Sequence, residues 1–137
     1  MPRRVFVDTG AWVALADASD SLHAVAVAAY PHILQTNTRL VTTNLVIGEA
    51  YNLIRRRLGH TPAMRFLQSL RVSPRLDKYY STAEWEMAAE ALLERYADQN
   101  FSFVDAVSFA MMHSEEIIEA FAFDKHFATA GFVLLPG

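Results

Sequence analysis

Short apolar runs that alternate with helix-like segments limit the fold of this chain more than any other feature. The first run, Arg4-Val5-Phe6-Val7-Asp8, is continuous and rich in β-branched residues, which predicts a central parallel strand buried on both faces. Further strands are expected at 40–43, 120–123 and 133–135, with a weaker candidate at 70–73. Because these runs alternate with helical segments, the sequence predicts βαβ units, and therefore a parallel sheet with helices on both faces.

The expected helices fill the intervals between these strands. They are predicted at 11–16, at 23–34, from Asn44 to Gly59, at 62–70, from a capping box at Ser81–Glu84 to 96, and from Phe103, capped by Ser102, to about Glu115. The sequence contains no internal repeat, low-complexity tract or linker. We therefore expect one α/β domain over residues 1–137.

Composition excludes several classes of protein. With 53% hydrophobic and 20% charged residues, the chain is neither disordered nor a coiled coil. No apolar run approaches the roughly 20 residues that span a bilayer, and the N-terminus does not resemble a secretory signal. The absence of cysteine excludes disulfides and thiolate zinc sites. A cytoplasmic location is the expectation.

Charge is distributed unevenly along the chain, although the formal net charge is only −3. Residues 50–78 carry seven lysines and arginines against one acid, Asp77. Residues 79–124 reverse this balance, because Arg95 is the one cation among ten acids. A chain polarised in this way can bind a polyanion on one side despite its acidic total.

Four acids are expected to meet at one edge of the sheet. Asp8 ends the first strand, and Asp124 directly follows the strand expected at 120–123. Asp105 lies in the first turn of a helix, and Glu49 lies in the helix after the second strand. Ligands of open parallel sheets bind at the carboxyl ends of the strands, so the four positions are consistent with one site.

Each acid also has a simpler structural explanation. Asp8 and Asp124 could be N-caps, Asp105 could form a capping pair with Ser102, and Glu49 could be a solvated helix residue. Helix capping alone would not place acids at the same edge of the sheet after three different strands. The joint placement of the four acids therefore favours a ligand-binding or catalytic site.

Clustered carboxylates repel one another and raise one another's pKa unless a cation neutralises them. Oxygen ligands without cysteine or a paired-histidine motif suit Mg²⁺ or Mn²⁺. The chemistry that follows is metal-assisted hydrolysis of a phosphodiester, with one or two ions left open.

Four motifs together resemble the PIN-domain family, and within it the small bacterial VapC-like toxins. They are Val5–Thr9, Thr43–Glu49, Phe101–Ala106 and Phe121–Phe127, and they span essentially the whole chain in order. The resemblance implies a PIN-like three-layer fold with a central, mostly parallel five-stranded sheet flanked by helices. It also implies an endoribonuclease that depends on Mg²⁺ or Mn²⁺, a homodimer, and a VapB-like antitoxin whose tail covers the acidic groove.

The resemblance also assigns roles to particular residues. Asp8, Glu49, Asp105 and Asp124 match the family's acidic quartet, which is catalytic and binds metal, with Asp124 the least direct ligand. Thr9 matches a hydroxyl residue that supports a metal-bound water or phosphate, and Ser102 matches a supporting serine.

Cations and one histidine complete the candidates. Arg55 and Arg56, together with Arg65 or Arg71, are candidate RNA contacts, with plain solvated charge as the alternative. His126 is interpreted as a packed or partly exposed helix residue in preference to a proton-transfer group.

Parts of the sequence are compatible with two other functions. A catalytically silent PIN-like module that binds RNA or protein is the alternative, and an intact acidic quartet argues against it. A phosphatase that uses Asp8 as nucleophile would need a second Asp two residues later, where Gly10 stands. The sequence leaves the RNA target open.

Overall fold

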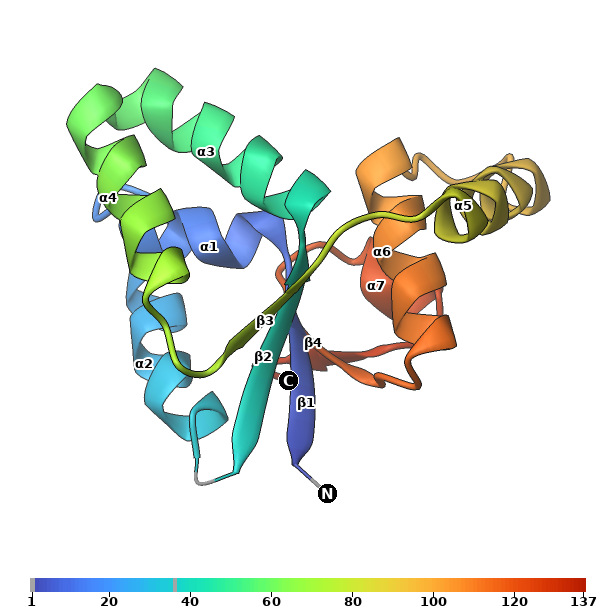
Figure 1. Cartoon of the computed structure of the whole chain (residues 1–137), viewed down its shortest axis with the longest axis horizontal. Coiled ribbons are helices and arrows are strands. Elements are labelled where there is room, and N and C mark those ends of the chain that lie inside the picture. The colour runs from blue at the N-terminus through green and yellow to red at the C-terminus, as the bar shows by residue number, and fades with distance from the viewer. Residues whose placement is uncertain (1, 36) are drawn as a thin grey trace.

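The computed structural model describes residues 2–35 and 37–137, so Met1 and Thr36, both inside the expected domain, lie outside the described residues. Within these residues five strands form one sheet (Figure 1). The strands are β1 (Arg3–Val7), β2 (Thr38–Thr43), β3 (Leu76–Tyr79), β4 (Glu119–Phe121) and β5 (Val133–Leu135). Their order is β3-β2-β1-β4-β5, and every neighbouring pair is parallel. The parallel sheet predicted from the sequence is confirmed.

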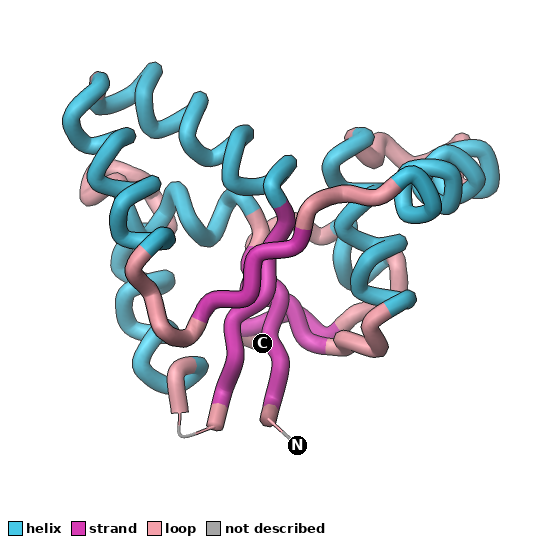
Figure 2. Tube along the Cα trace, in the orientation of Figure 1, coloured by secondary structure: helices cyan, strands magenta, loops and turns pink. Residues whose placement is uncertain are grey.

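The helices form two groups on opposite sides of the sheet (Figures 1 and 2). One group contains α1 (Thr9–Ala16), α2 (His23–Ile33), α3 (Asn44–Leu58) and α4 (His60–Arg71). The other contains α5 (Ala83–Arg95), α6 (Phe103–Ser114) and the short α7 (His126–Thr129). This is the expected three-layer arrangement.

The core lies on both faces of β1, as its apolar run predicts. Val5, Phe6 and Val7 are fully buried, and the Phe6 ring packs 6.0 Å from the Phe127 ring of α7. On the other side of the sheet, Tyr30 of α2 stacks on Phe121 of β4 at 6.3 Å between ring centroids. Both helix layers are therefore fixed to the central strands by apolar contact.

The strand predicted at 70–73 is wrong. Leu70 and Arg71 form the last turn of α4, and Val72 is 78% exposed. The third strand is instead β3, whose sequence Leu-Asp-Lys-Tyr has too few apolar residues to be recognised from its pattern. It lies at an edge of the sheet, where a strand contacts one neighbour and tolerates polar residues.

Two smaller boundaries also differ from expectation. The predicted capping box at Ser81–Glu84 is displaced by one residue, because Thr82 caps α5 and its hydroxyl accepts a hydrogen bond from the Trp85 amide at 3.1 Å. The strand expected at 120–123 ends at Phe121, so Asp124 follows it after a two-residue extension. Among the described residues, no helix is both long and apolar enough to cross a membrane.

Candidate acidic active site

The chain changes direction within the sheet between β1 and β4. It leaves β1 to form β2 and β3 on one side, and returns to form β4 and β5 on the other. In open parallel sheets this reversal leaves a crevice at the carboxyl ends of the strands, where ligands bind. Asp8 and Asp124 follow the two strands that border this point, and the Asp8 amide donates to the Phe121 carbonyl of β4 at 3.1 Å.

Asp8 is the most buried acid of the candidate site. It is the N-cap of α1, its backbone is extended, and only 6% of the residue is exposed. Burial raises the pKa of its carboxyl to about 7, and the Thr9 amide opposes this shift. The negative charges of Asp105, Asp124 and Glu49 raise the pKa further. The structure therefore brings all four predicted acids within electrostatic range of one buried carboxyl.

Asp105 occupies the first turn of α6 and forms a complete capping box with Ser102. The Ser102 hydroxyl accepts from the Asp105 amide at 3.0 Å, and Asp105 Oδ2 accepts from the Ser102 amide at 3.1 Å. The capping role weighed from the sequence is confirmed. The same contacts fix the carboxylate at the rim of the sheet, so capping and a place in the acidic cluster coexist.

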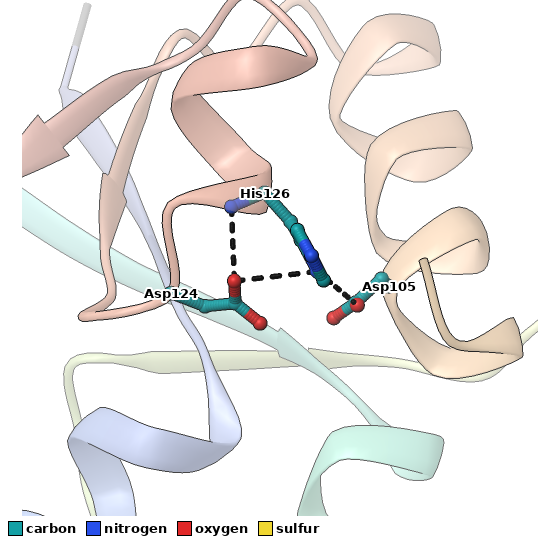
Figure 3. A group of neighbouring side chains, drawn as sticks. All are labelled: Asp105, Asp124 and His126. Carbon is teal, nitrogen blue, oxygen red and sulfur yellow. Dashed lines mark hydrogen bonds and ion pairs between the residues drawn. The ribbon is translucent and has the colours of Figure 1, made fainter. Parts of the chain in front are cut away.

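His126 lies between two of the acids, as Figure 3 shows. Its Nδ1 is 3.2 Å from Asp105 Oδ2 and 3.3 Å from Asp124 Oδ1, and its amide donates to Asp124 Oδ1 at 2.9 Å. The ring also packs edge-on against Phe101 at 5.0 Å. His126 is partly exposed, as expected, but its place beside the acids was not predicted. Its position two residues after Asp124 is the one available signal.

Glu49 and Thr9 approach the site from two other helices. Glu49 is half-buried on α3, whose first turn is capped by the Thr43 hydroxyl. Thr9 is the first residue of α1 and is 5% exposed, and its Oγ1 has no hydrogen-bond partner among the described residues. A buried hydroxyl without a hydrogen-bond partner costs free energy in the folded protein.

The predicted cationic contacts lie elsewhere. Arg55 is six residues beyond Glu49, roughly 9 Å along α3, and its Nη1 is 3.2 Å from the Tyr51 hydroxyl. Arg56 is exposed in the same turn, and Arg65 lies on α4. Their contact with RNA stays a prediction.

The side chains of the site suit a divalent cation. Among the described residues, ligand atoms of Asp105, Asp124 and His126 lie within 4.8 Å of one another, and Asp8 and Glu49 add carboxylate oxygens nearby. A concentration of negative charge around a buried carboxyl is what a hard cation neutralises. The donor set therefore fits such an ion.

Comparison with known proteins shows the family of the chain. The profile of the PIN domain matches residues 5–133. The chain is 39% identical over 132 residues to the 23S rRNA-specific endonuclease VapC20 from two strains of Mycobacterium tuberculosis, covering 94% of this chain and 95% of that protein.

A solved structure gives the same result. The crystal structure of Mycobacterium tuberculosis VapC20, described as a sarcin–ricin loop cleaving toxin, matches with a TM-score of 0.86 and 37% identity, over 94% of this chain and 96% of the other. Sequence and fold agree, and the chain belongs to the PIN-domain family as a homologue of VapC-type endonuclease toxins.

Proposed function

We propose that this protein is a metal-dependent endoribonuclease, and that it is the toxin of a VapBC-like toxin–antitoxin pair. One observation carries the proposal: Asp8 is buried at the reversal of strand order with three further carboxylates acting on it. The repulsion among these carboxylates destabilises the metal-free protein, and a bound cation would neutralise it. Full-length similarity to an endonuclease that acts on 23S rRNA supports RNA as the substrate.

Each residue of the site has a proposed role that follows from its position. Asp8, Glu49 and Asp105 are the proposed direct ligands of Mg²⁺ or Mn²⁺, with Asp124 at the outer side beside His126. A bound ion of this kind lowers the pKa of water and offsets charge on the scissile phosphate. His126 orients the Asp105 and Asp124 carboxylates through its Nδ1. Thr9 offers its unpaired hydroxyl to the phosphate or to a water, and Ser102 fixes Asp105.

The direct test is cleavage of an RNA hairpin that contains the sarcin–ricin loop of 23S rRNA, the target named for the homologue. We expect cleavage with Mg²⁺ or Mn²⁺ and none with EDTA. Asp8→Asn should reduce the rate at least about 100-fold, because neutralising a ligand removes several kcal/mol of transition-state stabilisation. Asp98→Asn, at an exposed acid in the turn after α5, is the matched control and should leave the rate unchanged.

The alternative of a silent binding module makes a different prediction. Such a module has no use for the cation, so calorimetry would detect no Mn²⁺ binding and the parent would cut no RNA. Mn²⁺ binding that disappears in Asp8→Asn, together with metal-dependent cleavage, would contradict this alternative.

The proposed protein partners are a VapB-like antitoxin and a second copy of the chain. An apolar groove of about 550 Å³ between α1, α2 and α4 supports a protein partner, and Trp12, Tyr30 and Phe66 contribute to its lining. The Trp12 indole N–H is buried there without a hydrogen-bond partner among the described residues. Co-expression with the product of a neighbouring gene should suppress cleavage, and sedimentation should give the oligomeric state.

A further inference from the structure

A second groove, of about 520 Å³, runs along the outer strand of the sheet. It lies between β3 and the helices α3 and α4, and is separate from the acidic site. Ile47 and Leu70 form part of its apolar wall, and Arg71 and Lys78 are its cations. Its volume is within the range of pockets that bind small organic ligands, so it can accommodate a nucleotide unit.

The alternation of side chains along β3 explains this lining. Leu76, Lys78 and Tyr80 are two residues apart, so they point to the same face of the sheet, and all three line the groove. Asp77 and Tyr79 point to the other face, where Asp77 pairs with Arg39 and the Tyr79 hydroxyl accepts from Arg4. The polar sequence of β3, unusual for a strand, is thus divided between a groove and an ion-pair network.

The groove presents positive charge that no described carboxylate pairs with. Among the described residues, neither Arg71 nor Lys78 forms an ion pair with a carboxylate, whereas Arg57 of the same basic segment is paired with Asp17 and Asp20. The Lys78 ammonium lies 4.7 Å from the centre of the Tyr80 ring, and Tyr80 remains 65% exposed. An exposed aromatic ring beside free cations is the combination that binds single-stranded nucleic acid.

One end of the groove lies at the same edge of the sheet as the acidic site. The Ser81 amide, next to Tyr80, donates to the side chain of Asn44 at 2.8 Å, and Asn44 is the first residue of the helix that carries Glu49. Tyr79 pairs with Thr43 in the sheet, so Tyr80 lies at the carboxyl edge, about 10 Å or two strand spacings from the end of β1.

The surface of α3 between the two sites carries no side chain at its centre. Ile47 lines the groove, and Glu49 is two residues further along α3, which corresponds to a rotation of about 200° around the helix axis. Gly48 lies between these two residues. Gly48 is exposed, and a Cβ at this position would have no heavy atom within 4 Å apart from its chain neighbours and the backbone of its own helix. The missing side chain at Gly48 leaves room for a polynucleotide that crosses the helix at this point.

We propose that the groove formed by Arg71, Lys78 and Tyr80 binds the RNA segment that flanks the cleaved bond, and that this segment reaches the acidic site across Gly48. Arg71 and Lys78 contact phosphates, and the Tyr80 ring stacks on a base. This inference rests on the proposed ribonuclease function and adds a substrate subsite to it. It also places the main cationic contact on α4 and β3 instead of on Arg55 and Arg56.

Binding can be measured without cleavage by placing each change in the Asp8→Asn background. The probes are the fluorescein-labelled sarcin–ricin hairpin and a labelled single-stranded oligonucleotide, followed by fluorescence anisotropy. Tyr80→Ala should raise Kd at least about fivefold, and Tyr80→Phe should restore it, because a phenyl ring also stacks. Arg71→Ala or Lys78→Ala should each lower the slope of log Kd against log salt by about 0.7.

Arg95→Ala is the matched control. Like Arg71, Arg95 is a cation in the last turn of a helix without a carboxylate partner among the described residues, but it lies on α5. It should leave Kd and its salt dependence unchanged. Gly48→Leu should weaken binding without lowering the melting temperature, since leucine is a better helix former than glycine.

The failure of this inference is distinguishable from the failure of the proposed function. If the parent cuts RNA and Arg71→Ala, Lys78→Ala and Tyr80→Ala all bind it like the parent, the groove is not an RNA subsite although the enzyme is a ribonuclease. If the parent cuts no RNA, the ribonuclease proposal fails, and the anisotropy still decides the groove. Variants that keep RNA affinity but lose affinity for a VapB-like antitoxin would also overturn the proposal.

Discussion

Charged side chains form ion pairs at the amino ends of the strands, whereas at the carboxyl ends one acid is buried among other acids. Where the strands begin, Arg3 Nε lies 2.8 Å from Glu119 and Arg4 Nη2 lies 3.0 Å from Glu115. The hydrogen bond from Arg3 lowers the pKa of the Glu119 carboxyl. Where the strands finish, Asp8 is buried among acids, forms no ion pair with any described residue, and burial raises its pKa to about 7.

This difference separates a structural role from a functional one. The partly exposed ion pairs at the amino end do not destabilise the folded state, so they give no indication of a ligand. The buried carboxyl of Asp8, which has no ion pair with a described residue, opposes folding when it is ionised, and natural proteins retain such conflicts mainly at functional sites. The comparison predicts that equivalent substitutions at the two ends have different effects.

The largest expected difference is in activity after a glutamate is changed to glutamine. Glu49→Gln should reduce RNA cleavage at least about 100-fold, because a proposed metal ligand loses its charge. Glu119→Gln, at the opposite end, should cut RNA at the parent rate. Cleavage rates at saturating Mg²⁺ measure both. Equal rates for the two variants would remove the functional distinction between the ends.

The second prediction concerns the pH dependence of stability in the metal-free protein. The pKa of Asp8 is raised from 3.8 to about 7 on folding, so the folded state retains a proton that the unfolded state has released between these values. Stability should therefore fall as pH rises through this window, by roughly 2–3 kcal/mol for Asp8 between pH 5 and 8.

Urea unfolding at pH 5 and pH 8 measures this effect. Asp8→Asn should abolish most of the loss, and Mn²⁺ should reverse it in the parent only, because a ligand that binds the folded state stabilises it. If the free energy of unfolding changed equally between pH 5 and pH 8 in the parent and in Asp8→Asn, the raised pKa of Asp8 would be contradicted.

The third prediction compares two buried threonines. Thr9 Oγ1 has no partner among the described residues, whereas the Thr42 hydroxyl donates to the Val7 carbonyl at 3.1 Å. Thr9→Val should stabilise the metal-free protein by about 1 kcal/mol, and Thr42→Val should destabilise it by a similar amount. Thermal denaturation tests the pair, and destabilisation by both changes would mean that Thr9 is satisfied in the free protein.

The smallest expected effect is at the amino end. Glu119→Gln should cost about 0.2–1 kcal/mol at pH 7, since the pair with Arg3 is partly exposed and screened. The folded pKa of Glu119 is depressed, so its contribution is present above its unfolded pKa and is lost as pH falls through the folded value. The difference between parent and variant should therefore vanish in acid and shrink at high salt.

Much of the site could be predicted because its signals are local. An apolar strand that ends at Asp8 fixes where that acid lies, and the spacing of Ser102 and Asp105 encodes a capping box that the structure contains. The third strand could not be located, because its residues do not follow an apolar pattern. Its polar residues are accounted for by tertiary contacts: Asp77 pairs with Arg39 on one face, and Lys78 lines the groove on the other. His126 was not assigned to the site, because its contact with Asp105 joins residues 21 positions apart.

The sequence alone determined the alternation of strands and helices, and with it a parallel sheet whose carboxyl edge collects four acids. Periodicity and capping act over a few residues, so they can be read along the chain. Tertiary structure alone decided which charges are paired and which are free. Arg57 is neutralised by Asp17 and Asp20 from the segment between α1 and α2, whereas Arg71 and Lys78 have no carboxylate partner in the described part of the chain and line the groove with Tyr80. Charge pairing and desolvation depend on distances across the fold, which no local pattern records.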